Sequence, residues 1–393
     1  MAAPVFLSYA WNDMSEVDTL DTMLRLRGVP VWRDRRNMRW GGYNEALVRR
    51  VLRDEASGFA LYLAEDALDS DFITGIELDE ADKRAASDPT FFHGGVFRGY
   101  EVRAGIEAVH QATGIDIGST LGSRIEERDF LTGLRDAANA ISRAYLRKEW
   151  ISGPACFRIE TRDPLPVDDP SLVQLSLAPP LSHDPDEYDV LIWDEQILPA
   201  LDDLQQSLHT VQSERPDCDR VIQVGGGLHL SVALAVGYAF RQPTRWQVRM
   251  LHEGATWETR RERGELAGWQ VSSRPGSGAD GDLVVMIHAS ADVSNAVRAS
   301  AGGLARAELQ FKPPDGGNRF AIDPRVANGV AAGIAEAIRE ARNQYKPKET
   351  RLYMASPWPF AVMLGWHLAS SGAVVMHEAT VERDAYRVSC VLR

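Results

Sequence analysis

The sequence predicts an α/β protein with more than one domain. Its 393 residues are two to three times the length of a typical domain of about 100–200 residues. Short apolar, strand-like runs alternate with helical patterns through residues 1–147, and residues 188–393 repeat the order strand, small loop, helix. This alternation predicts parallel strands joined by right-handed crossovers, with helices on both faces of each sheet.

The first domain is expected at residues 1–147. Strands and helices are expected, in chain order, at Val5–Ser8, Met14–Arg27, Val29–Trp32, Tyr43–Arg53, Phe59–Leu63, Asp71–Arg84, Phe91–Phe97, Tyr100–Gln111, Ile115–Ile117 and Glu126–Arg147. In the first of these helices Val17, Leu20 and Leu24 recur three and four residues apart, as on one helix face. Ligands of such folds bind beyond the carboxyl ends of the strands, here near Ser8 and Arg33.

Residues 148–187 differ in composition from the residues on either side. Seven prolines lie among Asp-rich turns between Pro154 and Pro185. We therefore predict a connector between two domains, with one edge strand at Val173–Leu177.

The second domain is expected at residues 188–393, and a start as early as residue 160 is left open. One half contains the strand Val221–Val224, a GGGLHLS loop and a helix with Gly237; the other contains the strand Leu352–Ala355, an SPWPF loop and a helix with Gly365. Further strands are expected after Asp189 and Asp282. Two halves related by a pseudo-two-fold axis would form a composite cleft where their strand-to-helix loops meet.

Composition and spacing exclude several classes of site. The net charge of −13 is shared almost equally between residues 1–147 and the remainder, which argues against binding of genomic nucleic acid. The three cysteines form no C-x-x-C pair, so neither a disulfide framework nor structural zinc is expected, and a reducing cytoplasm is the expected location. No signal peptide, membrane-length apolar run, H-E-x-x-H or G-x-S-x-G pattern occurs. We expect no metal, no cofactor and no membrane partner.

Two features remain as candidates for chemistry. The Gly225–Gly227 loop lies between a strand and a helix, where backbone amides can bind an anion, but the same glycines could simply form a tight turn. Glu77 follows Ile73 by four residues and so lies next to the packed side of its helix, although most helical glutamates are exposed to solvent. Both interpretations stay open at this point.

Residues 1–147 resemble a TIR domain, which has a flavodoxin-like parallel sheet. The resemblance rests on VFLSYAWND at Val5–Asp13, on VPVWRD with its RRNMRWGG loop, and on the ALYLAEDALDSDFITGIEL segment that contains Ser70-Asp71-Phe72 and Glu77. In NAD-cleaving members an acidic residue in the helix after the third strand is catalytic, which implies Glu77. The usual W-x-x-x-E or W-x-x-E spacing is not met, because Phe72 stands one or two residues further from the acid. Glu80 is therefore the alternative.

The same resemblance implies further roles. Nucleotide-pocket walls are expected from Phe6, Ser8, Trp32 and Arg33, and contacts with a neighbouring TIR domain from the loop containing Asp34, Arg39 and Trp40. Breaking the bond between nicotinamide and ribose develops positive charge at the anomeric carbon, which a carboxylate would stabilise.

Residues from about 160 to 393 look like a SAVED domain, a sensor of cyclic oligonucleotides built from two fused CARF-like Rossmannoid halves. The resemblance rests on the Gly-rich junction, the SPWPF segment and the two glycine-containing helices. The cleft is expected to hold phosphates at the amides of two helix starts and bases on aromatic faces, with seven lining residues: Gly226, Leu228, His229, Ser290, Ser356, Trp358 and Phe360.

The order TIR then SAVED resembles the effectors of CBASS anti-phage defence. It implies an NAD+ hydrolase that a cyclic oligonucleotide activates by inducing head-to-tail oligomers or filaments. Two other functions stay open: a non-enzymatic TIR scaffold coupled to the nucleotide sensor, and a ring nuclease in the C-terminal half.

Overall fold

The computed structural model describes most of the chain and divides it into two compact units. The described residues are 3–33, 44–64, 67–117, 123–126, 129–166, 169–177, 192–266, 268–278, 280–300, 305–314, 322–380 and 385–393. Unit 1 comprises residues 1–155, 166–175 and 203–219, and unit 2 comprises 156–165, 176–202 and 220–393. Each unit is described by itself below.

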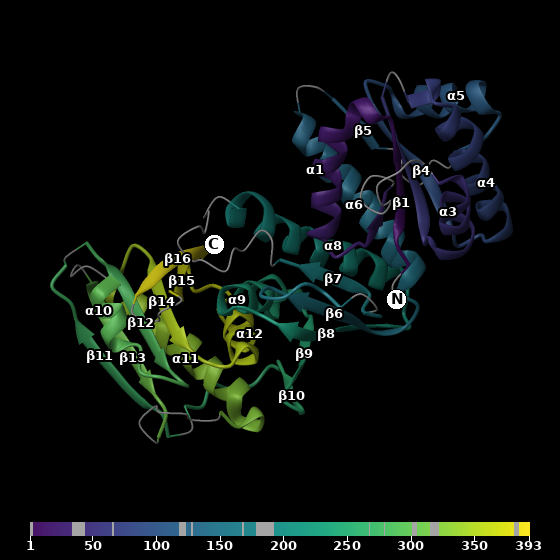
Figure 1. The fold of residues 1–393 in the computed structure, drawn as a ribbon. Helices are drawn as coiled ribbons and strands as arrows, with labels where there is room; N and C mark the ends of the chain where they lie inside the picture. The colour runs from purple at the N-terminus through teal and green to yellow at the C-terminus, as the bar shows by residue number, and fades with distance from the viewer. Residues whose placement is uncertain are drawn as a thin grey trace. The chain divides into compact units, whose positions relative to one another are not determined.

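Unit 1 contains a parallel five-stranded sheet of order β2-β1-β3-β4-β5 (Figure 1). The strands are β1 (Val5–Tyr9), β2 (Val31–Trp32), β3 (Gly58–Leu63), β4 (Phe92–Arg98) and β5 (Ser123–Ile125). The helices are η1 (Trp11–Asp13), α1 (Met14–Arg25), α3 (Glu45–Arg50), η2 (Val51–Glu55), η3 (Ala67–Asp69), η4 (Ile73–Glu77), α4 (Leu78–Ser87), α5 (Val102–Thr113) and α6 (Phe130–Glu149). The predicted alternation of strands and helices is therefore confirmed for this unit.

The two faces of this sheet are covered by different helices. Phe6, Phe59 and Leu61 point to one face, where they pack against apolar residues of α3, η2, η4, α4 and α5. Helices α1 and α6 pack against one another and supply a separate set of buried residues. Because strand residues alternate between faces, Ser8 shares the first face with Phe6, whereas Leu7 and Tyr9 face the other way.

The expected strand at Ile115–Ile117 is wrong. Helix α5 ends at Gly114, whose φ of 75° lies in the left-handed region, and the chain then passes Ile117, a buried residue outside any strand. The fifth strand forms later, at Ser123–Ile125, which pairs with Val96–Arg98. Two isoleucines spaced two residues apart predict a strand, because the same spacing occurs on the buried face of a strand and in a buried irregular segment.

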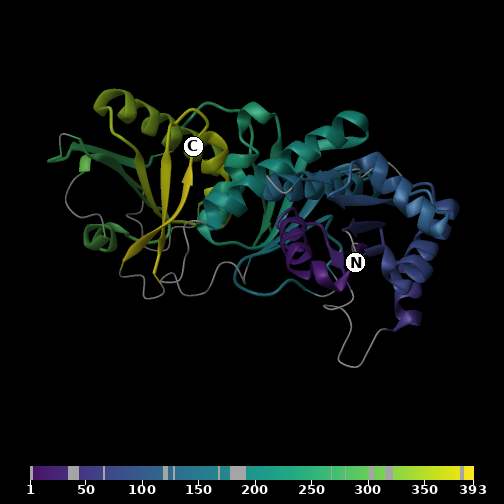
Figure 2. The same cartoon turned by 90° about the horizontal axis from the view of Figure 1, so that it is seen from above.

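Unit 2 contains a six-stranded sheet of order β11-β13-β12-β14-β15-β16, and a five-stranded sheet of order β10-β9-β8-β6-β7 has residues in both units, with most of β7 in unit 1. The strands are β6 (Gly153–Glu160), β7 (Val173–Ser176), β8 (Cys218–Gly227), β9 (Gln247–His252), β10 (Ala255–Glu258), β11 (Gln270–Pro275), β12 (Asp282–His288), β13 (Ala305–Lys312), β14 (Thr350–Ala355), β15 (Val374–Ala379) and β16 (Tyr386–Leu392). The helices are η8 (Trp193–Ile197), α9 (Leu230–Ala239), η9 (Gln242–Thr244), α10 (Ser294–Ser300), α11 (Pro324–Tyr345) and α12 (Trp358–His367), and α8 (Leu198–Glu214) has residues in both units. Figure 2 shows α10 and α11 on opposite faces of the six-stranded sheet.

The segment 148–187 is not simply a connector. It supplies β6, which lies inside the five-stranded sheet, as well as the expected edge strand β7. Every second residue of β6 is buried, namely Ala155, Phe157 and Ile159. Most of the prolines of this segment lie outside the two strands. A strand was also expected in the residues after Asp189. Residues 178–191 lie outside the described part of the chain, and where the description resumes Trp193 begins the helical turn η8 rather than ending a strand.

The internal repeat in unit 2 is confirmed by the contact between α9 and α12. A Cβ atom at Gly237 would overlap the carbonyl oxygen of Val362, three residues before Gly365. Reciprocally, a Cβ atom at Gly365 would overlap the carbonyl oxygen of Leu234, three residues before Gly237. The two helices therefore cross at glycines, in a two-fold arrangement that brings their backbones into direct contact (Figure 1).

None of the described helices is both long and apolar enough to cross a membrane. No disulfide joins Cys156, Cys218 and Cys390, all of which lie in the described part of the chain.

The helix crossing predicts that Gly237→Ala destabilises unit 2. The added methyl group meets backbone atoms, which cannot move aside as a flexible side chain can, and overpacking of this kind costs about 1–3 kcal/mol. Thermal unfolding followed by circular dichroism should show a melting temperature several degrees lower. Gly225→Ala is the matched control, because a Cβ atom there meets nothing within 4 Å. Equal melting temperatures for the two variants would contradict the close crossing.

Candidate functional site

The first candidate site is a cavity of about 850 Å³ within unit 2. It lies beyond the carboxyl ends of β8, β12 and β14, where α9, α10 and α12 begin. Its size is typical of a site for a small organic ligand. The lining residues are Arg162, Gly226, Gly227, Leu228, His229, Leu230, His252, Ser290, Ala291, Asp292, Val293, Ala296, Met354, Ala355, Ser356, Pro357, Trp358, Glu378, Ala379, Thr380 and Tyr386.

Six of the seven residues that the sequence predicts for a nucleotide cleft line this one cavity. They are Gly226, Leu228, His229, Ser290, Ser356 and Trp358, which come from three separate strand ends. The prediction is wrong for Phe360, which is fully buried and stacks on Trp269 with ring centroids 6.2 Å apart. Successive helical residues are about 100° apart around the axis, so Trp358 and Phe360 point to different sides of α12.

Trp358 is itself only 7% exposed. Its ring meets His252 edge to face, at 5.6 Å between centroids and 71° between planes. The tryptophan is therefore held in place as part of the wall, and His252 is a second aromatic group beside it that the sequence did not indicate.

The backbone amides at the start of α9 already have partners in the protein. The Gly227 amide donates to Oε2 of Glu160 at 3.0 Å, the His229 amide to Oγ1 of Thr161 at 2.8 Å, and the Ser231 amide to Oε2 of Glu378 at 2.9 Å. Gly225–Gly227 ends strand β8 rather than forming a free loop. The expectation that this helix start holds a phosphate is therefore wrong, because two carboxylates occupy the position of the anion.

Charged side chains line the cavity unevenly. Arg162 is exposed, and its positive charge opposes the rise in the pKa of Glu378 that burial causes. Burial raises the pKa of Glu378, although its hydrogen bond with Ser231 opposes this. Burial also opposes ionisation of Asp292, but hydrogen bonds from Ser294 and the nearby His288 lower the pKa of Asp292 to about 2. Arg162 is the one arginine or lysine among the described residues that line this cavity, and the sequence did not indicate it because it lies in the segment expected to be a connector.

A second candidate site lies in unit 1 at the carboxyl end of β1. The hydroxyl of Ser8 donates to Oε2 of Glu77 at 2.6 Å, and the two side chains are 2% and 6% exposed. The interpretation of Glu77 as a solvated helix residue is therefore wrong. Glu80, the alternative acid, instead forms an ion pair with Arg49.

The other residues expected around Glu77 do not all lie with it. Phe6 and Trp32 stack on one another at 4.6 Å in the core below Ser8, on the same face of the sheet. Arg33 follows Trp32 and so points to the opposite face, where it pairs with Asp18 and Asp21. Arg33 therefore lies on the opposite face of the sheet from Glu77. The loop residues Asp34, Arg39 and Trp40 lie outside the described part of the chain.

Within the described ranges, no three His, Cys, Asp or Glu side chains come together as a metal site would require.

Comparison with known proteins identifies the C-terminal half. Residues 202–392 match the SAVED family, described as the SMODS-associated and fused to various effectors sensor domain, and form a SAVED domain. The match leaves residues 1–201 outside it. No curated protein matches the sequence.

Two solved structures of the Acinetobacter baumannii Cap4 SAVED/CARF-domain containing receptor share the fold. The complex with the cyclic trinucleotide 2'3'3'-cAAA has a TM-score of 0.52 at 13% identity, covering 88% of this chain and 84% of the receptor. The complex with 3'3'3'-cAAA has a TM-score of 0.53 at 11% identity, covering 96% of this chain and 97% of the receptor. At these identities the likeness concerns the fold.

The burial of Glu378 predicts a pH-dependent contribution to stability. Its pKa is raised in the folded state, so the folded protein holds this proton more tightly than the unfolded chain. The contribution of Glu378 to the free energy of unfolding is complete below the pKa of an unfolded glutamate, about 4.3. As the pH rises through the folded pKa this contribution is lost, by up to about 1.4 kcal/mol for each pH unit.

Urea unfolding at a series of pH values checks this. The unfolding free energy of the native protein should fall relative to that of Glu378→Gln as the pH rises toward neutrality. Glu340→Gln, which changes an exposed glutamate on α11, should show no such trend. A difference between native protein and Glu378→Gln that does not vary with pH would show that the carboxyl titrates normally.

Proposed function

We propose that the cavity of unit 2 binds a cyclic oligonucleotide and that this binding controls an effector activity of unit 1. The observation that carries the proposal is the meeting of three strand ends around one cavity of about 850 Å³ in a SAVED domain. The Cap4 receptors, which share the fold, were solved with cyclic trinucleotides, and this supports a ligand of the same class. The biological setting that we propose is CBASS anti-phage defence.

The lining suits such a ligand on chemical grounds. Arg162 supplies a positive charge for a phosphate, and a guanidinium can bind two phosphate oxygens at once. Trp358 and His252 supply aromatic surface beside which a base can pack. The carboxylates of Asp292 and Glu378 repel phosphates and accept hydrogen bonds, so we place base or ribose groups near them rather than the ligand backbone.

The role of Arg162 can be tested by substitution. Arg162→Gln removes a charge-assisted contact worth about 1.5–3 kcal/mol, so it should weaken binding by about 10- to 100-fold. Isothermal titration against a panel of cyclic di- and trinucleotides that includes 3'3'3'-cAAA would measure this. Arg263→Gln, an exposed arginine that does not line the cavity, is the matched control. Binding that is unchanged in Arg162→Gln, or absent for the whole panel, would argue against the site.

For unit 1 we propose a TIR domain that hydrolyses NAD+ to nicotinamide and ADP-ribose products. The strand order 2-1-3-4-5 with all strands parallel is that of flavodoxin-like folds. The buried pair of Ser8 and Glu77 supports the activity more directly, because it fixes a carboxylate beyond the end of a central strand. A carboxylate held there can stabilise the positive charge that develops on the ribose as nicotinamide leaves.

Activation is proposed to require assembly. A cleft made of two unlike halves has no exact two-fold axis, so contacts between copies can be head-to-tail and form filaments. In this proposal the loop containing Asp34, Arg39 and Trp40 completes the site of a neighbouring copy. The ligand then acts by binding the assembled form more tightly than the monomer.

Glu77→Gln should lower NAD+ cleavage by on the order of 100-fold, the scale of losing one electrostatic contact to the transition state. Nicotinamide release measured with the activating nucleotide present gives the rate. Glu80→Gln is the matched control, since it removes a carboxylate three residues away that is paired with Arg49. Loss of activity in Glu80→Gln alone would shift the assignment to Glu80.

Two other functions are separated by the same assay. A protein that binds the nucleotide but never releases nicotinamide would be a TIR scaffold that recruits partners. Consumption of the cyclic nucleotide itself would indicate a ring nuclease in the C-terminal half.

A further inference from the structure

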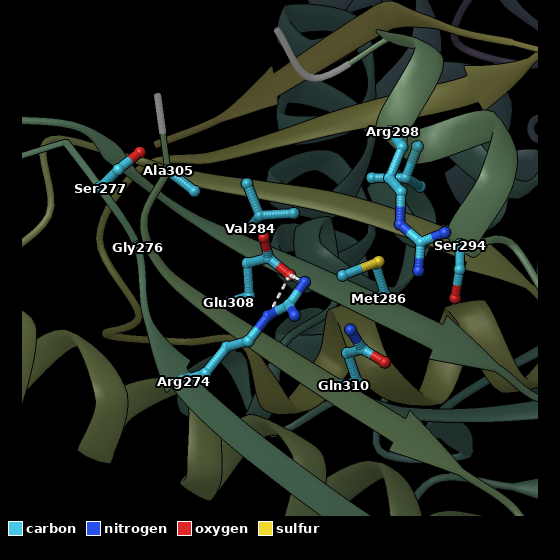
Figure 3. A pocket seen from close by; sticks show the side chains of 11 residues that line it. Arg274, Gly276, Ser277, Val284, Met286, Ser294, Arg298, Ala305, Glu308 and Gln310 are labelled. Carbon is cyan, nitrogen blue, oxygen red and sulfur yellow. Dashed lines mark hydrogen bonds and ion pairs between the residues drawn. The ribbon is translucent and has the colours of Figure 1, made fainter. Parts of the chain in front are cut away.

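A second, smaller cavity lies in unit 2 on the α10 face of the six-stranded sheet. It has a volume of about 200 Å³, and its residues come from β11, β12, β13 and α10 and from Gly276 and Ser277 after β11 (Figure 3). An engineered cavity of about 150 Å³ is large enough for benzene, so this one fits a single small molecule rather than a nucleotide. The lining residues are Arg274, Gly276, Ser277, Val284, Met286, Ser294, Val297, Arg298, Ala305, Glu308 and Gln310.

The floor of this cavity is apolar. Val284 and Met286 lie two residues apart on β12 and so point to the same face of the sheet, and Val297 of α10 packs with them. All three side chains are buried in the protein. They offer a surface for a short hydrocarbon group, whose burial is favourable at about 0.8 kcal/mol for each CH₂.

The charges around the floor do not cancel. Arg274 and Glu308 stand opposite one another on β11 and β13 and pair through Nε and Oε2 at 2.9 Å. Arg298 projects from α10, and in Figure 3 it approaches the floor from the side opposite Arg274. Its Nη1 contacts Oδ1 of Asn295 at 3.3 Å, and no described carboxylate pairs with it. The cavity therefore combines an apolar floor with one positive charge that the described residues leave uncompensated.

We propose that this cavity binds a small aliphatic carboxylate. The carboxylate group pairs with the guanidinium of Arg298, in the two-point geometry that guanidinium and carboxylate groups favour. The hydrocarbon chain lies on Val284 and Met286. Gln310 lies opposite Met286 on the neighbouring strand β13, and its side-chain amide can donate a hydrogen bond to a carboxylate oxygen.

The position of α10 gives such binding a consequence for the larger cavity. Val293, just before α10, and Ala296 line the larger cavity, whereas Val297 and Arg298 line the smaller one. A helix of seven residues depends on tertiary packing for its stability. A ligand that links Arg298 to the sheet would hold α10 in place, and by linkage each ligand would then raise the affinity for the other.

The experiment compares 4-methylpentanoate with 4-methylpentanamide, which has nearly the same shape and no charge. The full chain carries ¹³C-labelled methionine methyl groups, and Met286→Leu identifies the Met286 resonance. The carboxylate should shift this resonance with a Kd at least 10-fold lower than that of the amide. Arg298→Gln should remove the difference between the two ligands, and Arg261→Gln, an exposed arginine outside both cavities, should leave it unchanged.

Several results would overturn the proposal. The first is the absence of any Met286 shift at about 10 mM ligand, a concentration that nearly saturates a site with a Kd of about 1 mM. The second is equal affinities for the carboxylate and the amide. The third is a preference for the carboxylate that is unchanged in Arg298→Gln. Arg298 is exposed, so its substitution should leave the other methionine resonances in place and the fold intact. No nucleotide is present in this experiment, so its failure would leave the function proposed for the larger cavity unaffected.

Discussion

The close crossing of α9 and α12 is the constraint on which the architecture of unit 2 depends. Gly237 and Gly365 let the two helix backbones touch, and each glycine meets the carbonyl oxygen three residues before the other. This fixes the distance between the two halves, and with it the separation of the β8 and β14 strand ends. The cavity lies at those strand ends. A site composed of loops from distant parts of the chain is thus positioned by two rigid helices.

The backbone amides beside that cavity form hydrogen bonds with carboxylates of the protein itself. A Gly-rich junction before a helix is suited to an anion, but Glu160 and Glu378 are already bonded to the Gly227 and Ser231 amides. Desolvation of Glu378 is offset in part by that bond to the helix start, where negative charge is favoured. In the function proposed above, the ligand's phosphate pairs instead with Arg162, an exposed side chain that lines the cavity.

In unit 1 the alternation of side chains along the strands separates groups that lie close in sequence. Ser8 places its hydroxyl on the face that carries Glu77, and the stacked rings of Phe6 and Trp32 form the floor beneath it. Arg33 is one residue from Trp32 and faces α1 instead, where Asp18 and Asp21 neutralise it. The arginine that follows this strand therefore lies on the opposite face of the sheet from the carboxylate of Glu77.

The sequence by itself determined the α/β class, the parallel sheet of residues 1–147, the glycine-marked repeat and six of the residues around the larger cavity. These follow from local signals: the period of apolar residues, strand-to-helix junctions, and glycines where no side chain fits. Tertiary structure alone decided which groups share a face or a partner. Phe360 and Trp358 differ by two positions on one helix, yet one is core and the other wall. Arg162, which follows β6, and Glu378 of β15 line the cavity, and Glu160 of β6 accepts a hydrogen bond from the Gly227 amide. These pairings depend on contacts between residues far apart in the chain, which no local pattern encodes.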